Sequence, residues 1–164
     1  MADKIISQNL LHQMFEYKNG DLYRKITTSS RSLKGCKAGY LRNDGYFMTQ
    51  INHKNYLNHR LIYMMFHGYM PEFLDHIDGN PLNNCIENLR EATITQNNFN
   101  TKIKNSNTSG YKNVYWEKRC QKWLVKISAN KKEIHIGRFD NINDAIINAQ
   151  KARSIYHGKF ARHI

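Results

Sequence analysis

Residues 74–98 read LDHIDGNPLNNCIENLREATITQNN, and this segment says more about the fold than any other part of the chain. It holds an Asp-His pair at 75–76, a tight Asp-Gly-Asn-Pro loop at 78–81 and then Asn-Leu-Arg. Thr93 and Gln96 have the spacing of a capping box, in which each side chain accepts a bond from the other residue's main-chain N–H. A helix is therefore expected to begin at Thr93. The segment as a whole predicts a strand, a loop, a short strand and a helix.

The side chains of this segment suit the hydrolysis of a phosphodiester, which needs a base to activate water and a cation to neutralise charge. His76 is a candidate base, because a neutral imidazole takes up a proton near pH 7. Asn88 is a candidate to orient the imidazole through its amide oxygen. Asp75 and Asn97 offer the hard oxygen ligands that Mg²⁺ and Mn²⁺ prefer. Neighbouring strand residues point to opposite faces, so Asp75 and His76 can share a site only at a strand end or bend.

Plainer interpretations of the same residues are open at this point. An isolated Asp-His pair is most often part of a solvated turn, and Asn83 and Asn84 are typical of turn formation. Arg90 is more typical of a salt bridge or a phosphate contact than of a catalyst.

Residues 59–100 resemble the HNH nucleases, in the form found in phage and intron-encoded homing endonucleases. The matching residues are His59-Arg60-Leu61, Asp75 to Asn80, Leu82 to Asn84, Glu87 to Arg90, and Asn97. The resemblance implies an α+β fold with a ββα-metal module that binds one divalent cation, Mg²⁺ or Mn²⁺. It implies that His76 is the general base, that Asn88 orients it, and that Asp75 and Asn97 bind the metal. The products would carry a 3′-hydroxyl and a 5′-phosphate. Cys85 stands alone, so no structural zinc is expected.

The composition indicates a folded, intracellular protein with a polyanionic partner. The 164 residues carry a net charge of +12, and 40 % of them are apolar, which excludes a disordered basic tail. A generically basic protein is the alternative. The longest apolar run, residues 61–66, is far shorter than the ~20 residues that span a bilayer, and we expect no secretory signal. Three widely spaced cysteines indicate free thiols in a reducing compartment, and hence the cytoplasm.

The positive charge is unevenly distributed along the chain. Residues 1–103 hold 12 Lys and Arg against 9 Asp and Glu, whereas residues 104–164 hold 13 against 4, so their net charges are +3 and +9. The stretch 101–109 between these parts is polar and has the composition of a linker. The predicted organisation is an N-terminal β-hairpin region belonging to the nuclease module (1–57), the HNH module (58–100), the linker (101–109) and a C-terminal domain (110–164). The resemblance to the HNH endonucleases implies that the N-terminal hairpins add DNA contacts.

The C-terminal part predicts a three-stranded antiparallel sheet packed on one helix. Strand-like segments occupy residues 111–116, 122–128 and 133–137. A helix is expected to start near Asn141, with Ala145, Ile146, Ala149, Ala152 and Tyr156 forming its apolar stripe. A basic sheet of this kind can enter a major groove and contact both phosphates and base edges.

Residues 109–161 resemble the AP2 DNA-binding domain, which accompanies HNH modules in some phage endonucleases. The matching stretches are Gly110 to Trp116, Lys122-Trp123, Ile136 to Asp140, Asp144-Ala145 and Gly158 to Ala161. The resemblance implies DNA contacts from Lys112, Tyr115, Lys118, Arg119, Lys122, Lys126 and His135, to which Arg90 of the first part is added. Plant-type domains carry Arg at several strand positions where this chain has Tyr115, Lys122 and Ser128, so their base preference does not transfer.

The sequence therefore predicts a site-specific DNA endonuclease of the homing type, acting on double-stranded DNA as a monomer or homodimer. Nicking and double-strand cleavage both stay open. If the chain is encoded by a phage, it would act in the cytoplasm of the host cell. Two rival hypotheses are a sequence-specific DNA-binding protein with an inactive nuclease module, and a non-specific HNH nuclease.

Overall fold

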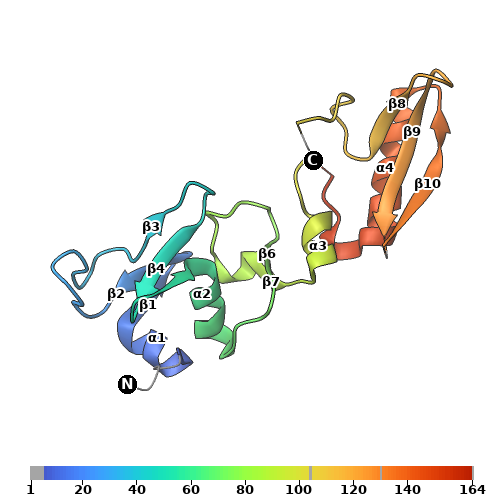
Figure 1. Ribbon diagram of the computed structural model, residues 1–164. Coiled ribbons are helices and arrows are strands. Elements are labelled where there is room, and N and C mark those ends of the chain that lie inside the picture. The colour runs from blue at the N-terminus through green and yellow to red at the C-terminus, as the bar shows by residue number, and fades with distance from the viewer. Residues whose placement is uncertain (1–5, 104, 130, 164) are drawn as a thin grey trace. The chain divides into compact units, whose positions relative to one another are not determined.

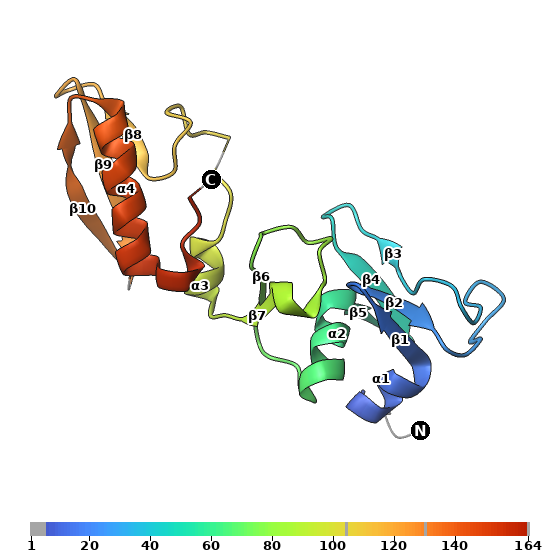
Figure 2. The same cartoon turned by 180° about the vertical axis from the view of Figure 1, so that it is seen from behind.

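The computed structural model describes residues 6–103, 105–129 and 131–163 (Figures 1 and 2). The chain divides between Ala92 and Thr93 into two units, and each unit is considered by itself. The helix that the sequence places in the HNH module, near Asn97, belongs to the second unit. Lys104 of the expected linker lies outside the described residues. Among the helices that are described, none is long and apolar enough to cross a membrane.

The first unit is built from a helix and hairpins that surround a central helix. Its elements are α1 (Gln8–Met14), β1 (Phe15–Lys18), β2 (Asp21–Arg24), β3 (Tyr40–Leu41), β4 (Phe47–Ile51), β5 (Lys54–Leu57), α2 (Asn58–His67), β6 (Leu74–His76), η1 (Ile86–Asn88) and β7 (Leu89–Glu91). Strands β1 and β2 form one antiparallel pair, β3, β4 and β5 form a three-stranded antiparallel sheet, and β6 pairs with β7.

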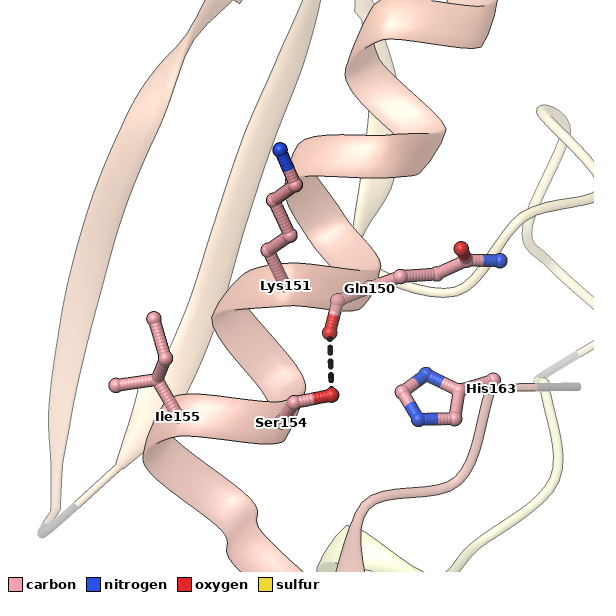
Figure 3. A pocket seen from close by; sticks show the side chains of 5 residues that line it. All are labelled: Gln150, Lys151, Ser154, Ile155 and His163. Atoms are coloured by element: carbon pink, nitrogen blue, oxygen red, sulfur yellow. Dashed lines mark hydrogen bonds between the residues drawn. The ribbon is translucent and has the colours of Figure 1, made fainter.

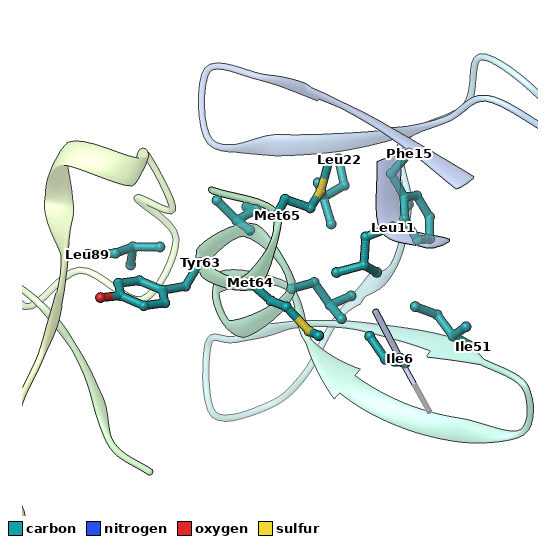
Figure 4. Close-up of a cluster of buried hydrophobic side chains, with 12 residues drawn as sticks. Ile6, Leu11, Phe15, Leu22, Ile51, Tyr63, Met64, Met65 and Leu89 are labelled. Carbon is teal, nitrogen blue, oxygen red and sulfur yellow. The ribbon is translucent and has the colours of Figure 1, made fainter. Parts of the chain in front are cut away.

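Helix α2 lies at the centre of the apolar core of the first unit (Figure 4). Leu61 and Ile62 of α2 are fully buried against residues from α1, β1 and β2, among them Leu11, Phe15 and Leu22. The helix ends at Gly68, whose φ of 82° lies in the left-handed region that glycine adopts without steric cost. A glycine after an apolar run is a common sequence signal for the end of a helix.

The start of α2 is held by a buried polar chain. Thr49 Oγ1 of β4 donates to Asn58 Oδ1 at 2.7 Å, and Asn58 Nδ2 donates to the Ala38 carbonyl at 2.9 Å. Further along, the Arg60 guanidinium donates to the carbonyls of Pro71 and Glu72, in the segment that leads to β6. Helix α2 is thus fixed both to the β3–β4–β5 sheet and to the approach to β6.

The second unit is a three-stranded sheet packed on one long helix. Its elements are α3 (Ile94–Phe99), β8 (Val114–Glu117), β9 (Lys122–Ala129), β10 (Lys132–Phe139), α4 (Ile142–His157) and η2 (Gly158–Phe160). The strands are antiparallel in the order β10–β9–β8. Val114 and Val125 of the sheet pack against Ala145 and Ala149 of α4. Small antiparallel sheets combined with helices confirm the α+β prediction.

One residue of the predicted apolar stripe on α4 does not behave as expected. Ala145, Ala149 and Ala152 are buried, but Tyr156 is 44 % exposed and lies outside the core. Placing Tyr156 in the stripe was therefore wrong. The buried residues near the end of α4 are instead Arg153 and His157, and His157 Nε2 lies 3.0 Å from the Ser128 carbonyl of β9.

Candidate active site

The β6–β7 hairpin positions the predicted catalytic residues of the first unit. In its antiparallel register Asp75 lies opposite Arg90, and His76 lies opposite Leu89. Asp75 and His76 are the last two residues of β6, and they are only 9 % and 5 % exposed. They occupy a strand end, which is the condition under which such neighbours can share a site.

The loop between the two strands is held together by Asp78 and Asn88. Asp78 Oδ1 accepts from the Asn80 N–H at 2.8 Å and from Asn88 Nδ2 at 3.0 Å, while Asp78 Oδ2 accepts from Asn83 Nδ2 at 2.7 Å. Asn88 also donates to the Asn83 carbonyl, and its Oδ1 accepts from the Asp78 N–H. Burial raises the pKa of Asp78, but these hydrogen bonds outweigh it and leave the pKa below its usual value.

The amide that contacts His76 is that of Asn84. His76 Nε2 and Asn84 Oδ1 lie 2.9 Å apart, and Asn84 is only 2 % exposed. An amide oxygen can only accept, so Nε2 carries the proton and Nδ1 holds the basic lone pair. The sequence expected Asn88 in this role, whereas the hydrogen bonds of the Asn88 side chain go to Asp78 and Asn83 in the loop.

Two further rings surround His76. The His59 ring of α2 packs edge-on at 4.9 Å between centroids, and the Tyr46 ring lies 6.0 Å from His76 and 5.4 Å from His59. Burial, with repulsion from His76 and Arg60, lowers the pKa of His59 to about 3. His59 is therefore neutral at physiological pH and adds no charge beside His76.

Asp75 is paired with Arg90 across the hairpin. Arg90 Nε and Nη2 donate to Asp75 Oδ2 at 2.8 and 2.7 Å, and both side chains are largely buried. A buried carboxylate needs such a cation, because leaving it uncompensated costs several kcal/mol. Arg90 thus neutralises the predicted metal ligand in this structure.

Asn97, the other predicted metal ligand, lies on α3 in the second unit. The capping box predicted at Thr93 and Gln96 is confirmed, with both reciprocal bonds formed. Asn97 Oδ1 is out of contact with solvent and accepts no hydrogen bond from the described residues. A buried amide oxygen without a donor fits a hard cation, as does the carboxylate of Asp75. Within the described residues, three or more His, Cys, Asp or Glu side chains nowhere gather as a metal site.

Helix α3 is anchored to the rest of the second unit by Lys112, one of the predicted DNA contacts. Lys112 Nζ donates to the carbonyls of Phe99 and Thr101 at 2.7 and 2.6 Å. The Phe99 ring also stacks on His157 of α4, with 3.7 Å between centroids. Burial, with repulsion from nearby arginines, lowers the pKa of Lys112 to about 8. Lys112 is thus engaged in the fold itself.

The other predicted DNA contacts of the second unit lie on the outer face of the sheet and in one of its turns. Tyr115 is 41 % exposed, with Lys126 Nζ 5.6 Å from its ring centroid. His135 pairs with Lys126 in the sheet register. Lys118 and Arg119 are exposed in the turn between β8 and β9.

The lysines of this outer face form ion pairs with neighbouring carboxylates. Lys122 pairs with Asp140 at 3.2 Å, and Lys126 pairs with Glu133 at 3.0 Å. Such partly exposed pairs contribute only about 0–1 kcal/mol each. A phosphate can therefore replace the carboxylate at little cost.

A pocket beside α4 contains none of the predicted residues. Ser154 Oγ donates to the Gln150 carbonyl at 3.1 Å, and Lys151, Ile155 and His163 also line this pocket (Figure 3). These side chains do not gather into a chemical site comparable to the one at His76.

Three residues near His76 were missed by the sequence predictions as contributors to a site. Asn84 was taken as a turn residue, although it belongs to the matching Leu82 to Asn84 stretch. His59 also belongs to a matching stretch and offered the same signal. Tyr46 follows a hairpin turn 30 residues before His76, and no local pattern points to its position.

Comparisons with known proteins find similarity in the part of the chain that holds the candidate active site. Residues 56–99 match the family model described as HNH endonuclease. The chain is 39 % identical over 90 residues to Protein 3.8 of Escherichia phage T7, covering 55 % of this chain and 74 % of that protein. It is 37 % identical over 75 residues to YosQ, a prophage-derived protein of Bacillus subtilis whose name assigns it to the HNH homing endonucleases. It is 42 % identical over 78 residues to an uncharacterized HNH endonuclease, L560, of Acanthamoeba polyphaga mimivirus.

The length covered differs among these relatives. The matches to YosQ and L560 cover 42 % and 46 % of this chain, but only 43 % and 41 % of the relatives' own length. No solved structure matches the chain.

Proposed function

The chain belongs to the HNH endonuclease family, and from this premise we propose that it is a metal-dependent DNA endonuclease with His76 as its general base. The observation that carries the proposal is the buried hydrogen bond from His76 Nε2 to Asn84 Oδ1. This bond leaves the basic lone pair on Nδ1, where it can take a proton from water as the water attacks phosphorus. The products then carry a 3′-hydroxyl and a 5′-phosphate.

Asp75 and Asn97 are the residues proposed to hold one Mg²⁺ or Mn²⁺ ion. When bound, such an ion supplies the positive charge that stabilises the 3′-oxygen leaving group. Asp75 offers a carboxylate that is now paired with Arg90, and Asn97 offers a buried amide oxygen without a donor among the described residues. Asn88 contributes by holding the loop through Asp78 and Asn83.

DNA binding is assigned in this proposal to the second unit as an AP2-like domain. Support comes from its net charge, its three-stranded sheet on one helix, and an outer face with exchangeable ion pairs. The proposed contacts are Tyr115, Lys118, Arg119, Lys122, Lys126 and His135, with Arg90 as a phosphate contact from the first unit. We extend the proposal to site-specific cleavage of the homing type, by a monomer or homodimer in the cytoplasm of a host cell.

The test compares wild type with His76→Ala on double-stranded phage DNA, in Mg²⁺, in Mn²⁺ and in EDTA. We expect cutting that needs the metal and is lost in the variant, while a gel-shift assay shows DNA binding retained. Ends or nicks that DNA ligase seals directly would establish the 3′-hydroxyl and 5′-phosphate products. Specific binding without cutting by the wild type would favour an inactive nuclease module, and cutting without site preference would favour a non-specific nuclease.

A further inference from the structure

The β3–β4 hairpin of the N-terminal region reaches the neighbourhood of His76. Its turn is closed by hydrogen bonds from Arg42 N to the Tyr46 carbonyl at 2.9 Å and from Gly45 N to the Arg42 carbonyl at 3.0 Å. A Cβ added at Gly45 would lie 3.3 Å from Pro81 Cγ, so this turn packs closely on the loop between β6 and β7. The tip of the hairpin therefore lies beside the loop that follows His76.

Tyr46 is the residue of this hairpin whose side chain lies beside His76. Its ring lies 6.0 Å from that of His76 and 5.4 Å from that of His59, and the two histidine rings are 4.9 Å apart. Because His59 is buried in α2, the ring of Tyr46 packs on a fixed surface. Tyr46 itself is only partly buried, so its ring borders the site rather than filling the core.

The hydroxyl of Tyr46 is available as a hydrogen-bond donor. Its main-chain N–H donates to Asp44 Oδ1, but the hydroxyl has no hydrogen-bond partner among the residues described. Burial, followed by the negative charges of Asp44 and Asp75, raises the pKa of Tyr46. The phenol therefore keeps its proton at neutral pH and can act as a donor.

We propose that the Tyr46 hydroxyl donates a hydrogen bond to a non-bridging oxygen of the phosphodiester attacked beside His76. This makes Tyr46 a catalytic residue, and the inference rests on the proposed function. Negative charge grows on the phosphate oxygens in the transition state, and a fixed neutral donor stabilises it without pairing with Asp75. The N-terminal region would thus complete the active site in addition to any contact with flanking DNA.

The decisive variant is Tyr46→Phe, which removes the hydroxyl and keeps the ring packed on His59. Loss of one preorganised donor to a developing anion typically lowers kcat by about 100- to 1,000-fold. We expect a fall in kcat of at least about 10-fold in Mg²⁺, with KM and DNA affinity unchanged within about twofold. The matched control is Tyr156→Phe, which removes an exposed hydroxyl from α4 and should cut at the wild-type rate.

The pH–rate profile separates a catalytic Tyr46 from a merely structural one. If the Tyr46 hydroxyl contacts the phosphate, Tyr46→Phe lowers kcat by the same factor at every pH on the acid limb of the pH–rate profile. A displaced acid limb in Tyr46→Phe would show that Tyr46 acts through His76, and an unchanged kcat would remove it from the reaction; either result overturns the inference. Failure of the proposed function looks different, because wild type itself would then cut no DNA or His76→Ala would cut normally.

Discussion

Replacing Asn84 with alanine should damage catalysis more than folding. Asn84 and His76 are 2 % and 5 % exposed, and their hydrogen bond is 2.9 Å long. Removing the acceptor leaves the His76 Nε2–H without its partner in a buried place, which costs about 1–3 kcal/mol. The imidazole of His76 can lower this cost by rotating or by moving its proton to Nδ1. Either change displaces the basic nitrogen from its position in the wild type. Since about 1.4 kcal/mol corresponds to a factor of ten in rate, we expect kcat to fall about 10- to 100-fold.

The assay is single-turnover cleavage of labelled DNA at saturating Mg²⁺, with urea unfolding as the measure of stability. Asn84→Asp provides a second test of the same contact. The aspartate still accepts a hydrogen bond from His76, and its negative charge favours the imidazolium form of His76. The acid limb of the pH–rate profile of this variant should move to higher pH by about one unit. Its activity is then depressed at pH 6 and recovers towards pH 8.

Asn88→Ala is the comparison that decides between the two amides. Asn88 bonds to Asp78 and Asn83, so its loss should lower the free energy of unfolding and leave the acid limb in place. The reasoning is refuted if Asn84→Ala cleaves at the wild-type rate while folded. It is equally refuted if the acid limb moves in Asn88→Ala and not in Asn84→Asp.

Three further predictions follow from charge and burial. Folding lowers the pKa of His59 from 6.5 to about 3, so the free energy of unfolding should drop as pH falls from 6.5 towards 3, by up to about 1.4 kcal/mol per pH unit. In urea titrations His59→Gln should show a weaker dependence of stability on pH. The same dependence in wild type and variant would contradict the prediction. Lys112→Met should lower the free energy of unfolding of the second unit by about 1–3 kcal/mol, since two bonds to carbonyls are lost. Because the pKa of Lys112 is lowered to about 8 on folding, wild type should gain stability relative to Lys112→Met between about pH 8 and 10. Lys118→Ala and Arg119→Ala should each reduce the slope of log affinity against log salt by about one unit, and an unchanged slope would exclude phosphate contacts there.

The elements that could be predicted from sequence are those specified by local chemistry. Gly68 ends α2 because glycine alone adopts its backbone angle without strain, and Thr93 with Gln96 starts α3 through bonds within one turn. The alternation of Trp123, Val125 and Ile127 made the inner face of β9 recognisable, and Val125 and Ile127 are buried.

The arrangement around His76 depends on contacts that no local pattern encodes. Asn84 and Asn88 are chemically identical and lie 8 and 12 residues after His76, so only the path of the loop decides which amide meets the imidazole. The Asp78 carboxylate accepts a hydrogen bond from Asn88, and the amide of Asn84 contacts His76 instead. Tyr46 comes from a separate hairpin, and the Lys112 side chain donates to main-chain carbonyls although the AP2 resemblance predicts a DNA contact there.

In the second unit, ion pairs show which part of the surface carries the excess positive charge. Residues 104–164 contain four acidic residues, and three of them pair with cations: Glu117 with Arg138, Glu133 with Lys126, and Asp140 with Lys122. The sheet face is therefore nearly balanced, and the excess charge lies in the turns, on α4 and in the segment after it, for example at Lys118, Lys151 and Arg162. If this face enters a groove, salt-dependent affinity should come mainly from Lys118 and Arg119. Discrimination between bases should then come from the face, where each lysine is held in one direction by its carboxylate until a base or phosphate replaces it.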